Sequence, residues 1–350
     1  MRKTHCVKVG NILIGGDAPV SVQTMIKVQT SHTEEVIKQI KKIQCAGGEI
    51  VRLAVLNKDD VFSLKKIKKR VSIPLVADIH YNYTLGIESI EAGVDKIRVN
   101  PSNIPESGMK KIIKKAIEKK IPVRLGLNSG SIKIKRTGLV ASIIDSALDS
   151  IKLCEDMGFF DIVISLKTPY VDDTISAYRA VSERCDYPLH LGITEAGSGY
   201  YGFAKNAIGI GILLYEGIGN TIRVSLTDSP DIEVECACAI LQALGLRRFQ
   251  PEIISCPVCG RCQVPLDRIV SRFKKKIIAF SKKNPDMKNL KIAIMGCSVN
   301  GPGEAKQADI GIAGGKDRFA LFVKGKITGT YPLKQIEKEF FSRIKEMTNG

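Results

Sequence analysis

The sequence lacks several features that would assign it directly to a class of protein. It has no tryptophan and only four histidines, and aromatic residues make up 6% of the chain. It contains no run of about 18 apolar residues, and its first ten residues, MRKTHCVKVG, lack the apolar stretch of a secretory signal. These absences argue against a membrane span and against export. We therefore predict a cytoplasmic protein with no membrane partner and with reduced cysteines.

The chain is also short of negative charge. Lysine and arginine number 53 against 36 aspartates and glutamates, which gives a net charge of +17. The runs KKIKKR (65–70), KKIIKKAIEKK (110–120) and RFKKKI (272–277) lie in helix-like patterns and are typical of solvated helix faces. They could also attract a phosphorylated substrate, an acidic protein or nucleic acid. Because aromatic residues are scarce and no zinc-finger spacing with paired histidines occurs, we predict no nucleic-acid partner.

Apolar segments that favour strands alternate with amphipathic, helix-like segments along most of the chain. The strand candidates are 20–25, 50–55, 74–79, 96–100, 122–128, 161–167, 188–193 and 221–226. Eight strands in alternation with helices favour a TIM (β/α)8 barrel over an open sheet.

The alternation stops after about residue 246. A helix candidate (267–282) and a strand candidate (291–296) follow in the remaining segment. We predict an α/β protein with a TIM barrel over residues 1–248 and a smaller α+β domain over residues 249–350.

Polar and charged side chains fall at the carboxyl ends of the strand candidates or in the turns after them. These candidate substrate-binding residues are Arg52, Asp78, His80, Arg98, Asn100, Arg124, Asn128, Lys167, Glu195, Arg223 and Ser225. In a closed barrel these ends meet at one mouth, where barrel enzymes carry out their chemistry. Four arginines and one lysine that converge there require an anion. A diphosphate is the natural candidate, because a guanidinium can donate two hydrogen bonds to phosphate oxygens.

The segment GSGYYG (197–202) offers an alternative. It matches the dinucleotide-binding pattern G-x-G-x-x-G and follows a strand candidate. However, the acidic residue expected at the end of a second strand, about 20 residues later, is absent. A flexible loop near the phosphate end of a barrel accounts for the glycines equally well.

Three cysteines lie within SCPVCGRC (255–262), and the next one, Cys297, opens a Gly/Pro-rich turn after a strand candidate. Zinc sites and iron–sulfur clusters both take about four protein ligands. Zinc is disfavoured because no histidine follows residue 190 and the cysteines do not form two pairs. An iron–sulfur cluster is therefore favoured, and counting alone would allow Cys262 as a fourth ligand.

The pairing of SCPVCGRC with MGCSVNGPGEA resembles the family of bacterial 4-hydroxy-3-methylbut-2-enyl diphosphate synthases, in its two-domain form. This family belongs to the methylerythritol phosphate route to isoprenoids. Further blocks that resemble it, in the same order, are GGDAPVSVQTM, VADIHYNY, VDKIRVNPSNI, PVRLGLNSGS, PLHLGITEAG and EGIGNTIRVSL. The resemblance thus covers nearly the whole chain.

The resemblance implies a [4Fe–4S] cluster held by Cys256, Cys259, Cys297 and Glu304, the glutamate of NGPGE. Cys262 is not a ligand in the family, so we expect a spare thiol near the cluster. A carboxylate exchanges more readily on iron than a thiolate does, which implies a catalytic role for Glu304.

The resemblance also implies an activity. It is the reductive ring opening and dehydroxylation of 2-C-methyl-D-erythritol 2,4-cyclodiphosphate, which yields 4-hydroxy-3-methylbut-2-enyl diphosphate and water. Reduced flavodoxin or ferredoxin supplies two electrons, and a head-to-tail homodimer brings the barrel of one subunit to the cluster of the other. The matched substrate binders are Arg52, His80, Arg98, Arg124, Lys167, Arg223 and Ser225. Asp78, Asn128 and Glu195 match positions near the substrate, with Glu195 as the candidate proton donor.

One block departs from the family. Residues 24–35 read TMIKVQTSHTEE, where the family commonly has a Ser-Met-Thr-Asn-Thr-like run. The contacts of this loop therefore cannot be carried over from the resemblance.

Two other classes of function stay open on the sequence alone. A non-catalytic iron–sulfur redox carrier or sensor would need the cysteines but not the polar mouth. A basic nucleic-acid-binding protein would need the lysines but neither motif.

Overall fold

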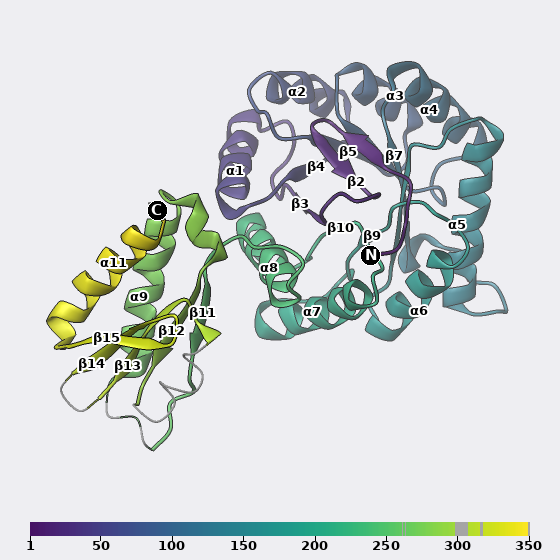
Figure 1. Cartoon of the computed structure of the whole chain (residues 1–350). Coiled ribbons are helices and arrows are strands. Elements are labelled where there is room, and N and C mark those ends of the chain that lie inside the picture. The colour runs from purple at the N-terminus through teal and green to yellow at the C-terminus, as the bar shows by residue number, and fades with distance from the viewer. Residues whose placement is uncertain (261, 263, 298–306, 316–317, 349–350) are drawn as a thin grey trace. The chain divides into compact units, whose positions relative to one another are not determined.

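A computed structural model of the chain describes residues 1–260, 262, 264–297, 307–315 and 318–348. The chain forms two compact units, Met1–Arg247 and Arg248–Gly350 (Figure 1). No helix in these described ranges is both long and apolar enough to cross a membrane.

The first unit contains eight parallel strands. They are β3 (Ser21–Met25), β4 (Ile50–Ala54), β5 (Leu75–Ile79), β6 (Lys96–Val99), β7 (Val123–Asn128), β8 (Ile162–Lys167), β9 (His190–Leu191) and β10 (Thr221–Ile222). Their order in the sheet is β8-β7-β6-β5-β4-β3-β10-β9. A parallel bridge between Ile164 and Leu189 joins the two ends of this sheet. The predicted TIM barrel is therefore confirmed.

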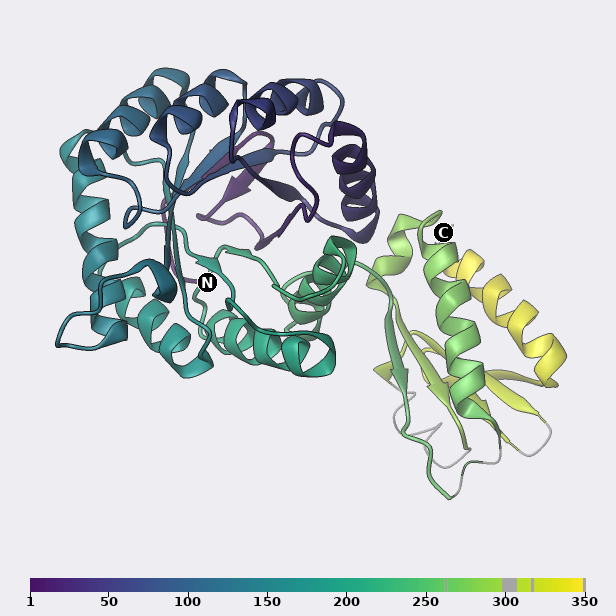
Figure 2. The same cartoon turned by 180° about the vertical axis from the view of Figure 1, so that it is seen from behind.

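Helices surround these strands in both views of the chain (Figures 1 and 2). They are α1 (Thr33–Ala46), α2 (Lys58–Lys68), α3 (Tyr83–Glu91), α4 (Glu106–Lys119), α5 (Leu139–Asp156), α6 (Val171–Ser182), α7 (Gly199–Tyr215) and α8 (Pro230–Ala243). A short 3-10 helix, η1 (Ser129–Ser131), follows β7. Helix α1 shows how the local sequence sets such boundaries, because Gly47 ends it with a φ of 100°, a conformation that glycine adopts without strain.

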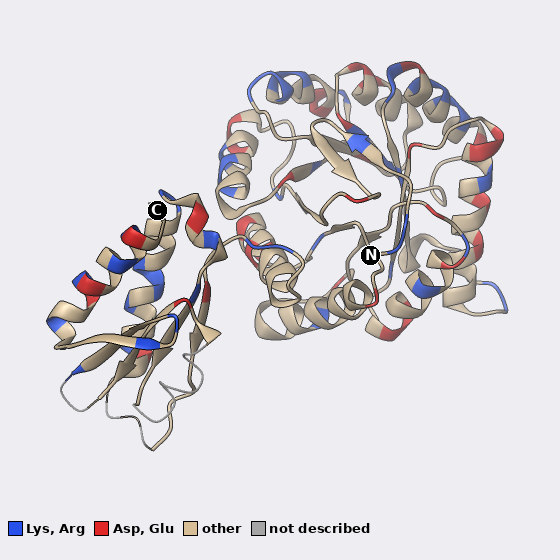
Figure 3. Ribbon diagram, viewed as in Figure 1, with Lys and Arg blue, Asp and Glu red and all other residues tan. Residues whose placement is uncertain are grey.

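Most residues of the lysine runs are exposed, in or directly after α2, α4 and α9 (Leu266–Ser281). Positive and negative residues are interspersed along the outer helices (Figure 3). Each run contains residues in ion pairs, such as Lys68 with Asp95, Lys115 with Glu118, and Lys276 with Glu337. Such exposed pairs contribute only about 0.2–1 kcal/mol each. Their placement agrees with solvated helix faces as the reason for these runs.

An antiparallel hairpin covers the amino-terminal end of the barrel. It consists of β1 (Val7–Val9) and β2 (Ile12–Ile14). Its apolar side chains Val7, Val9 and Ile14 form one cluster with Ile50, Val76 and Val163, which lie near the start of β4, β5 and β8. This apolar plug leaves the opposite, carboxyl-terminal end of the barrel for polar residues.

The second unit is a five-stranded mixed sheet with helices. Its strands, in sheet order, are β11 (Glu252–Ser255), β12 (Lys291–Met295), β13 (Ile310–Gly314), β14 (Phe319–Val323) and β15 (Lys326–Tyr331). Its helices are α9 (Leu266–Ser281), η2 (Pro285–Asn289) and α11 (Leu333–Thr348). The first three strands run parallel and the last two are antiparallel to their neighbours. Phe273 of α9 and Phe340 of α11 meet edge to face in its core. The predicted smaller α+β domain is thus confirmed as a fold.

Candidate functional site

Eight of the predicted site residues line one cavity at the carboxyl ends of the barrel strands. The lining consists of Arg52, His80, Arg98, Arg124, Asn128, Ser165, Lys167, Thr194, Arg223 and Ser225. The cavity volume is about 80 Å³, well below the roughly 300–1,000 Å³ of pockets that enclose whole ligands. The cavity thus suits a compact charged group. Ser165 and Thr194 were not among the residues predicted from the sequence.

The parallel register places the cations of neighbouring strands at one level. Asp78 of β5 lies opposite Arg98 of β6, and Arg98 lies opposite Arg124 of β7. Because side chains of parallel strands in register point to the same face, these three enter the barrel interior together. Toward the carboxyl ends, β7 and β8 pair Gly126 with Ser165 and then Asn128 with Lys167.

Asp78 is the carboxylate that holds this group of cations together. Its Oδ1 accepts a hydrogen bond from Nη1 of Arg98 at 3.1 Å, and its Oδ2 lies 3.6 Å from Nε of Arg52 and 3.6 Å from Nε2 of His80. Burial alone would raise the pKa of Asp78, but the charge of Arg52, the hydrogen bond from His80 and the charge of Arg98 hold that pKa well below its usual range. Asp78 is therefore ionised and orients the arginines on either side of it.

Two further cations of the mouth, Arg124 and Lys167, form no ion pair within the described residues. Nε and Nη1 of Arg124 and Nζ of Lys167 make no hydrogen bond within the described part of the chain. Burial, and after it the neighbouring arginines, lower the pKa of both side chains. The same causes lower the pKa of Arg52 to about 9, which leaves it charged at neutral pH. Among the described residues, the mouth of the barrel therefore holds more cations than carboxylates that pair with them.

Two glycines make room for these cations. A Cβ atom on Gly126 would lie 2.2 Å from Nε of Arg98, and one on Gly192 would lie 2.5 Å from Nζ of Lys167. Any larger residue at these positions would displace the cation. The sequence carries a signal for both, since each glycine interrupts an otherwise apolar strand candidate, in RLGLN and HLGI, which indicates a close approach.

Three predicted site residues do not line the cavity, namely Asp78, described above, Asn100 and Glu195. Asn100 is buried and binds both η1 and its own loop, with Nδ2 donating to Oγ of Ser131 at 2.8 Å and Oδ1 accepting from the N–H of Ser102 at 3.1 Å. Glu195 is exposed, directly after Thr194, and has a φ of 51°. Such a left-handed conformation is strained for a residue other than glycine, and such strain occurs often at functional sites.

The dinucleotide-binding alternative is not supported by the fold. GSGYYG lies in the loop after β9 and in the first turn of α7, which begins at Gly199. This loop belongs to a closed barrel, and not to the open sheet that the dinucleotide motif requires.

A layer of polar side chains lies between the cationic mouth and the apolar plug. Each member has at least one buried side-chain N or O atom that makes no hydrogen bond within the described ranges. The members are Ser21, Gln23, Lys96, His190 and Thr221. Lys96 is fully buried, and burial, followed by the charges of Arg124 and Arg52, lowers its pKa well below the usual range. The fold therefore keeps an amine in a place that disfavours its charge.

Lys96→Met is expected to stabilise the barrel by roughly 1–3 kcal/mol, because an unpaired buried polar group costs about that much. The folded state lowers the pKa of Lys96, so between its folded and unfolded pKa values the unfolded state binds more protons there. Wild-type stability should then rise with pH toward the unfolded pKa of about 10.4, and the advantage of the variant should shrink over that range. Urea denaturation at several pH values measures this. Lys152→Met, an exposed residue of α5, is the control and should have little effect at any pH. If Lys96→Met is less stable than wild type, or more stable by the same amount at every pH, Lys96 is not an unpaired buried amine whose charge the fold disfavours.

The cysteines gather at one end of the sheet of the second unit. Cys256 directly follows β11, and Cys297 lies two residues after β12, its parallel neighbour. The N–H of Gly296 donates to Sγ of Cys256 at 3.4 Å, and the N–H of Cys262 donates to the carbonyl of Cys259 at 2.9 Å. A Cβ atom on Gly296 would lie 2.5 Å from Sγ of Cys262, so that thiol packs beside the turn that carries Cys297.

The described residues do not by themselves form a closed metal site. In those parts of the chain, no three His, Cys, Asp or Glu side chains are grouped closely enough to hold a metal ion. Glu304, the predicted fourth ligand, lies outside the described residues. The donor chemistry nevertheless fits an iron–sulfur cluster, because thiols are the ligands that such clusters use. Cys256 and Cys259 follow β11, and Cys297 follows its parallel neighbour β12.

Comparisons with known proteins agree with this division of the chain. Two family models match it, the GcpE TIM-barrel domain over residues 4–238 and the GcpE protein C-terminal domain over residues 252–346. A relative from Caldanaerobacter subterraneus subsp. tengcongensis is 47% identical over 99% of this chain and 98% of its own length. One from Ruminiclostridium cellulolyticum is 48% identical over the same shares. Both are named 4-hydroxy-3-methylbut-2-en-1-yl diphosphate synthase (flavodoxin).

Two solved structures share the fold of 69% of this chain. A dihydropteroate synthase from Stenotrophomonas maltophilia aligns with a TM-score of 0.53 and 13% identity, over 69% of this chain and 98% of its own. A dihydropteroate synthase from Coxiella burnetii aligns with a TM-score of 0.52 and 14% identity, over 69% of this chain and 98% of its own. At this identity the likeness shows a shared fold.

Proposed function

The chain belongs to the GcpE family, and from this premise we propose that it forms 4-hydroxy-3-methylbut-2-en-1-yl diphosphate in the cytoplasm, with electrons from flavodoxin. The substrate is the cyclic diphosphate of methylerythritol, which the reaction reduces by two electrons while one oxygen leaves as water. One observation carries the proposal. Four cations at the barrel mouth, Arg98, Arg124, Lys167 and Arg223, have buried donor atoms without a partner in the described structure, and a diphosphate supplies the negative charge that they lack.

Within this proposal the residues of the mouth bind and orient the substrate. Arg124 and Lys167 donate to the diphosphate from the floor of the cavity, because their free donors lie there. Asp78 holds Arg52 and Arg98 in position without binding the substrate itself. Glu195, an exposed carboxylate beside the cavity residue Thr194, donates a proton to the departing oxygen.

Cys256, Cys259 and Cys297 would hold a [4Fe–4S] cluster, with Glu304 as the fourth ligand. When bound, such a cluster supplies electrons and a Lewis-acidic iron. Support comes from the donor chemistry of the three thiols and from the relatives, whose name includes flavodoxin. Cys262 packs beside Gly296 and remains a spare thiol in this assignment.

An anaerobic assay tests the function directly. Purified protein is incubated with the cyclic diphosphate and a chemical reductant, the product is measured, and an optical spectrum and iron content are recorded. We expect product, a brown protein and about four irons per chain. A brown protein that binds no cyclic diphosphate would be a redox carrier or sensor. A colourless protein with stoichiometric zinc would overturn the cluster.

The proposal includes a head-to-tail homodimer in which the barrel of one subunit works with the cluster of the other. Glu195→Ala and Cys297→Ser, each inactive alone, are expected to regain up to about a quarter of wild-type activity when mixed under conditions of subunit exchange, because half of the dimers then contain one intact site. Activity of the mixture measures this, with exchange verified by two affinity tags. Full exchange without recovery would place the site within one chain.

A further inference from the structure

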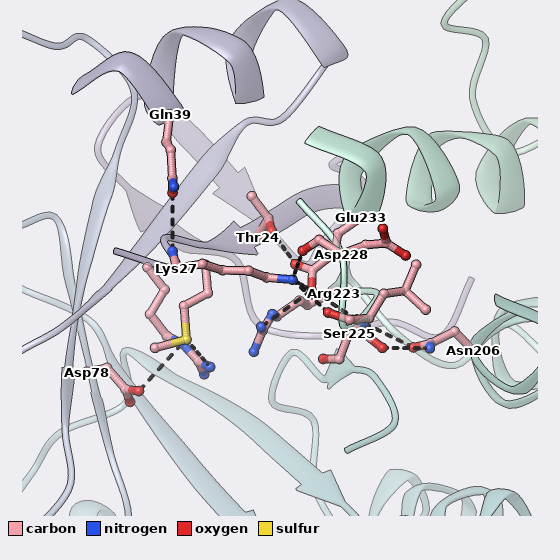
Figure 4. Close-up of polar contacts among 12 residues, drawn as sticks. Thr24, Lys27, Gln39, Asp78, Asn206, Arg223, Ser225, Asp228 and Glu233 are labelled. Carbon is pink, nitrogen blue, oxygen red and sulfur yellow. Dashed lines mark hydrogen bonds and ion pairs between the residues drawn. The ribbon is translucent and has the colours of Figure 1, made fainter. Parts of the chain in front are cut away.

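Lys27 connects two loops at the barrel mouth. It lies in the loop after β3, in the block that departs from the family's usual run. Its Nζ donates to the carbonyl of Leu226 at 2.6 Å and to the carbonyl of Asp228, both in the loop between β10 and α8 (Figure 4). The same Nζ lies 3.0 Å from Oε1 of Glu233. The side chain of Lys27 thus joins the loop after β3, the first barrel strand, to the loop after β10, the last one.

Glu233 is a buried carboxylate with a fixed position. Only 1% of its surface is exposed, in the first turn of α8. Its Oε2 accepts from Oγ1 of Thr24 at 2.6 Å, and its Oε1 accepts from the N–H of Leu226 at 2.9 Å (Figure 4). A buried carboxylate requires a positive partner, because removing one partner of such a pair leaves an uncompensated charge.

Two cations can serve as that partner. Lys27 lies 3.0 Å from Oε1 of Glu233, whereas Nη2 of Arg223 lies 3.9 Å from the same oxygen. Arg223 lines the cavity, and its Nε makes no hydrogen bond in the described structure. The shorter distance indicates that Lys27 compensates Glu233, so Arg223 keeps its donors available for the cavity.

We propose that Lys27 is a positioning residue, which neutralises Glu233 and thereby leaves Arg223 free to bind an anionic substrate. Without Lys27, the guanidinium of Arg223 is the remaining neighbouring cation and turns toward Glu233, away from the cavity. The segment that carries Arg223 stays in place, since Asn206 of α7 binds Ser225 through its carbonyl at 3.1 Å and its N–H at 3.3 Å. Loss of Lys27 thus changes the direction of the Arg223 side chain and not the position of its backbone. The inference rests on the proposed function only for the identity of the anion.

Lys27→Met tests this, because methionine keeps the apolar stem and removes the charge. We expect affinity for the cyclic diphosphate to fall about 10-fold or more, the loss typical of one charge-assisted contact, with KM raised and kcat nearly unchanged. Calorimetry on anaerobic protein measures the affinity without turnover.

A second substitution separates this role from a purely structural one. Glutamine at position 233 can still accept from the N–H of Leu226 and can donate to Oγ1 of Thr24, but it carries no charge to attract Arg223. Glu233→Gln in the Lys27→Met background is therefore expected to restore most of the lost affinity. If Lys27 serves only to tie the loops together, the double variant binds as weakly as Lys27→Met or more weakly, and the proposal is overturned.

A matched control and a crystal structure complete the test. Lys68 is as exposed as Lys27, at 31%, and pairs with Asp95 near the amino end of β6, so Lys68→Met should leave the affinity unchanged. The crystal structure of Lys27→Met should show Arg223 within hydrogen-bond distance of Glu233, compared with 3.9 Å here. If wild-type protein fails to bind the cyclic diphosphate, the proposed function falls and this crystal structure still decides the inference. If wild-type protein binds it and Arg223 has not moved in the variant, the inference falls and the proposed function stands.

Discussion

Cys256→Ser, Cys259→Ser and Cys297→Ser are each expected to remove the iron and all turnover, because each variant lacks one thiolate that the cluster requires. Cys262→Ser should keep both, since the thiol of Cys262 donates to the carbonyl of Val264 and packs against Gly296. Iron content, the optical spectrum and product formation measure this under anaerobic conditions. Thermal unfolding of the barrel unit should be unchanged in all four variants. Loss of iron from Cys262→Ser, with retention in one of the others, would reassign the ligand set.

The expected ligand Glu304 extends this series. A carboxylate is a harder and more exchangeable ligand for iron than a thiolate. Glu304→Cys should therefore retain iron and lose most turnover, whereas Glu304→Ala should lose iron readily in the presence of oxygen. Mössbauer spectra and rates that match wild-type protein in both variants would exclude Glu304 as a ligand.

The barrel could be predicted because its strands are buried on both faces. Segments such as DIVISLK read as continuous apolar runs, and six residues of β8, Ile162–Lys167, are all buried. The hairpin of β1 and β2 was missed, although VKVGNILI carries a signal, namely two alternating runs around a Gly-Asn pair. Its residues lie outside the repeating pattern of strand and helix.

The last two barrel strands are shorter than the sequence indicates. The pattern predicts strands over 188–193 and 221–226, but β9 and β10 each contain only two residues. The N–H of Arg223 still donates to the carbonyl of Leu191 in β9 at 3.0 Å, and Ser225 and Leu226 are then held by side chains. Asn206 binds Ser225, and Glu233 binds the N–H of Leu226. Such contacts join segments that are distant in the chain, so local periodicity does not reveal them.

The same reason explains which site residues were missed. The cations of the mouth were predicted because each ends a strand, and a barrel brings strand ends together. Glu233 gave no such signal, since a glutamate in the first turn of a helix commonly stabilises the helix dipole. Its role depends on Thr24, Lys27 and Leu226, which come from two other loops and a strand.

The second large expected effect comes from replacing Arg98 or Arg124 by methionine. The two substitutions should change the free energy of unfolding in opposite directions. Nη1 of Arg98 donates to Asp78 at 3.1 Å and its Nη2 donates to the carbonyl of Gly126 at 3.0 Å. Arg98→Met leaves that buried carboxylate with weaker compensation, and breaking such a pair costs about 3–5 kcal/mol. By contrast, Nε and Nη1 of Arg124 have no partner in the described structure, and its nearest charges are mainly other cations. Arg124→Met removes repulsion and an unpaired buried group, so the folded barrel should become more stable.

Binding should fall in both variants, since each loses a charged donor to the diphosphate. A loss of roughly 1.5–3 kcal/mol per charge-assisted contact corresponds to about 10- to 150-fold in affinity. Denaturation of the free protein and calorimetry with the cyclic diphosphate, on the same preparations, separate the two effects. Arg136→Met, outside the cavity lining, is the control for loss of one positive charge. A barrel that holds its cations for an anion should gain stability when Arg124 is lost and bind the diphosphate less well. If Arg124→Met is less stable and binds normally, the charge at the mouth serves the fold and not a substrate.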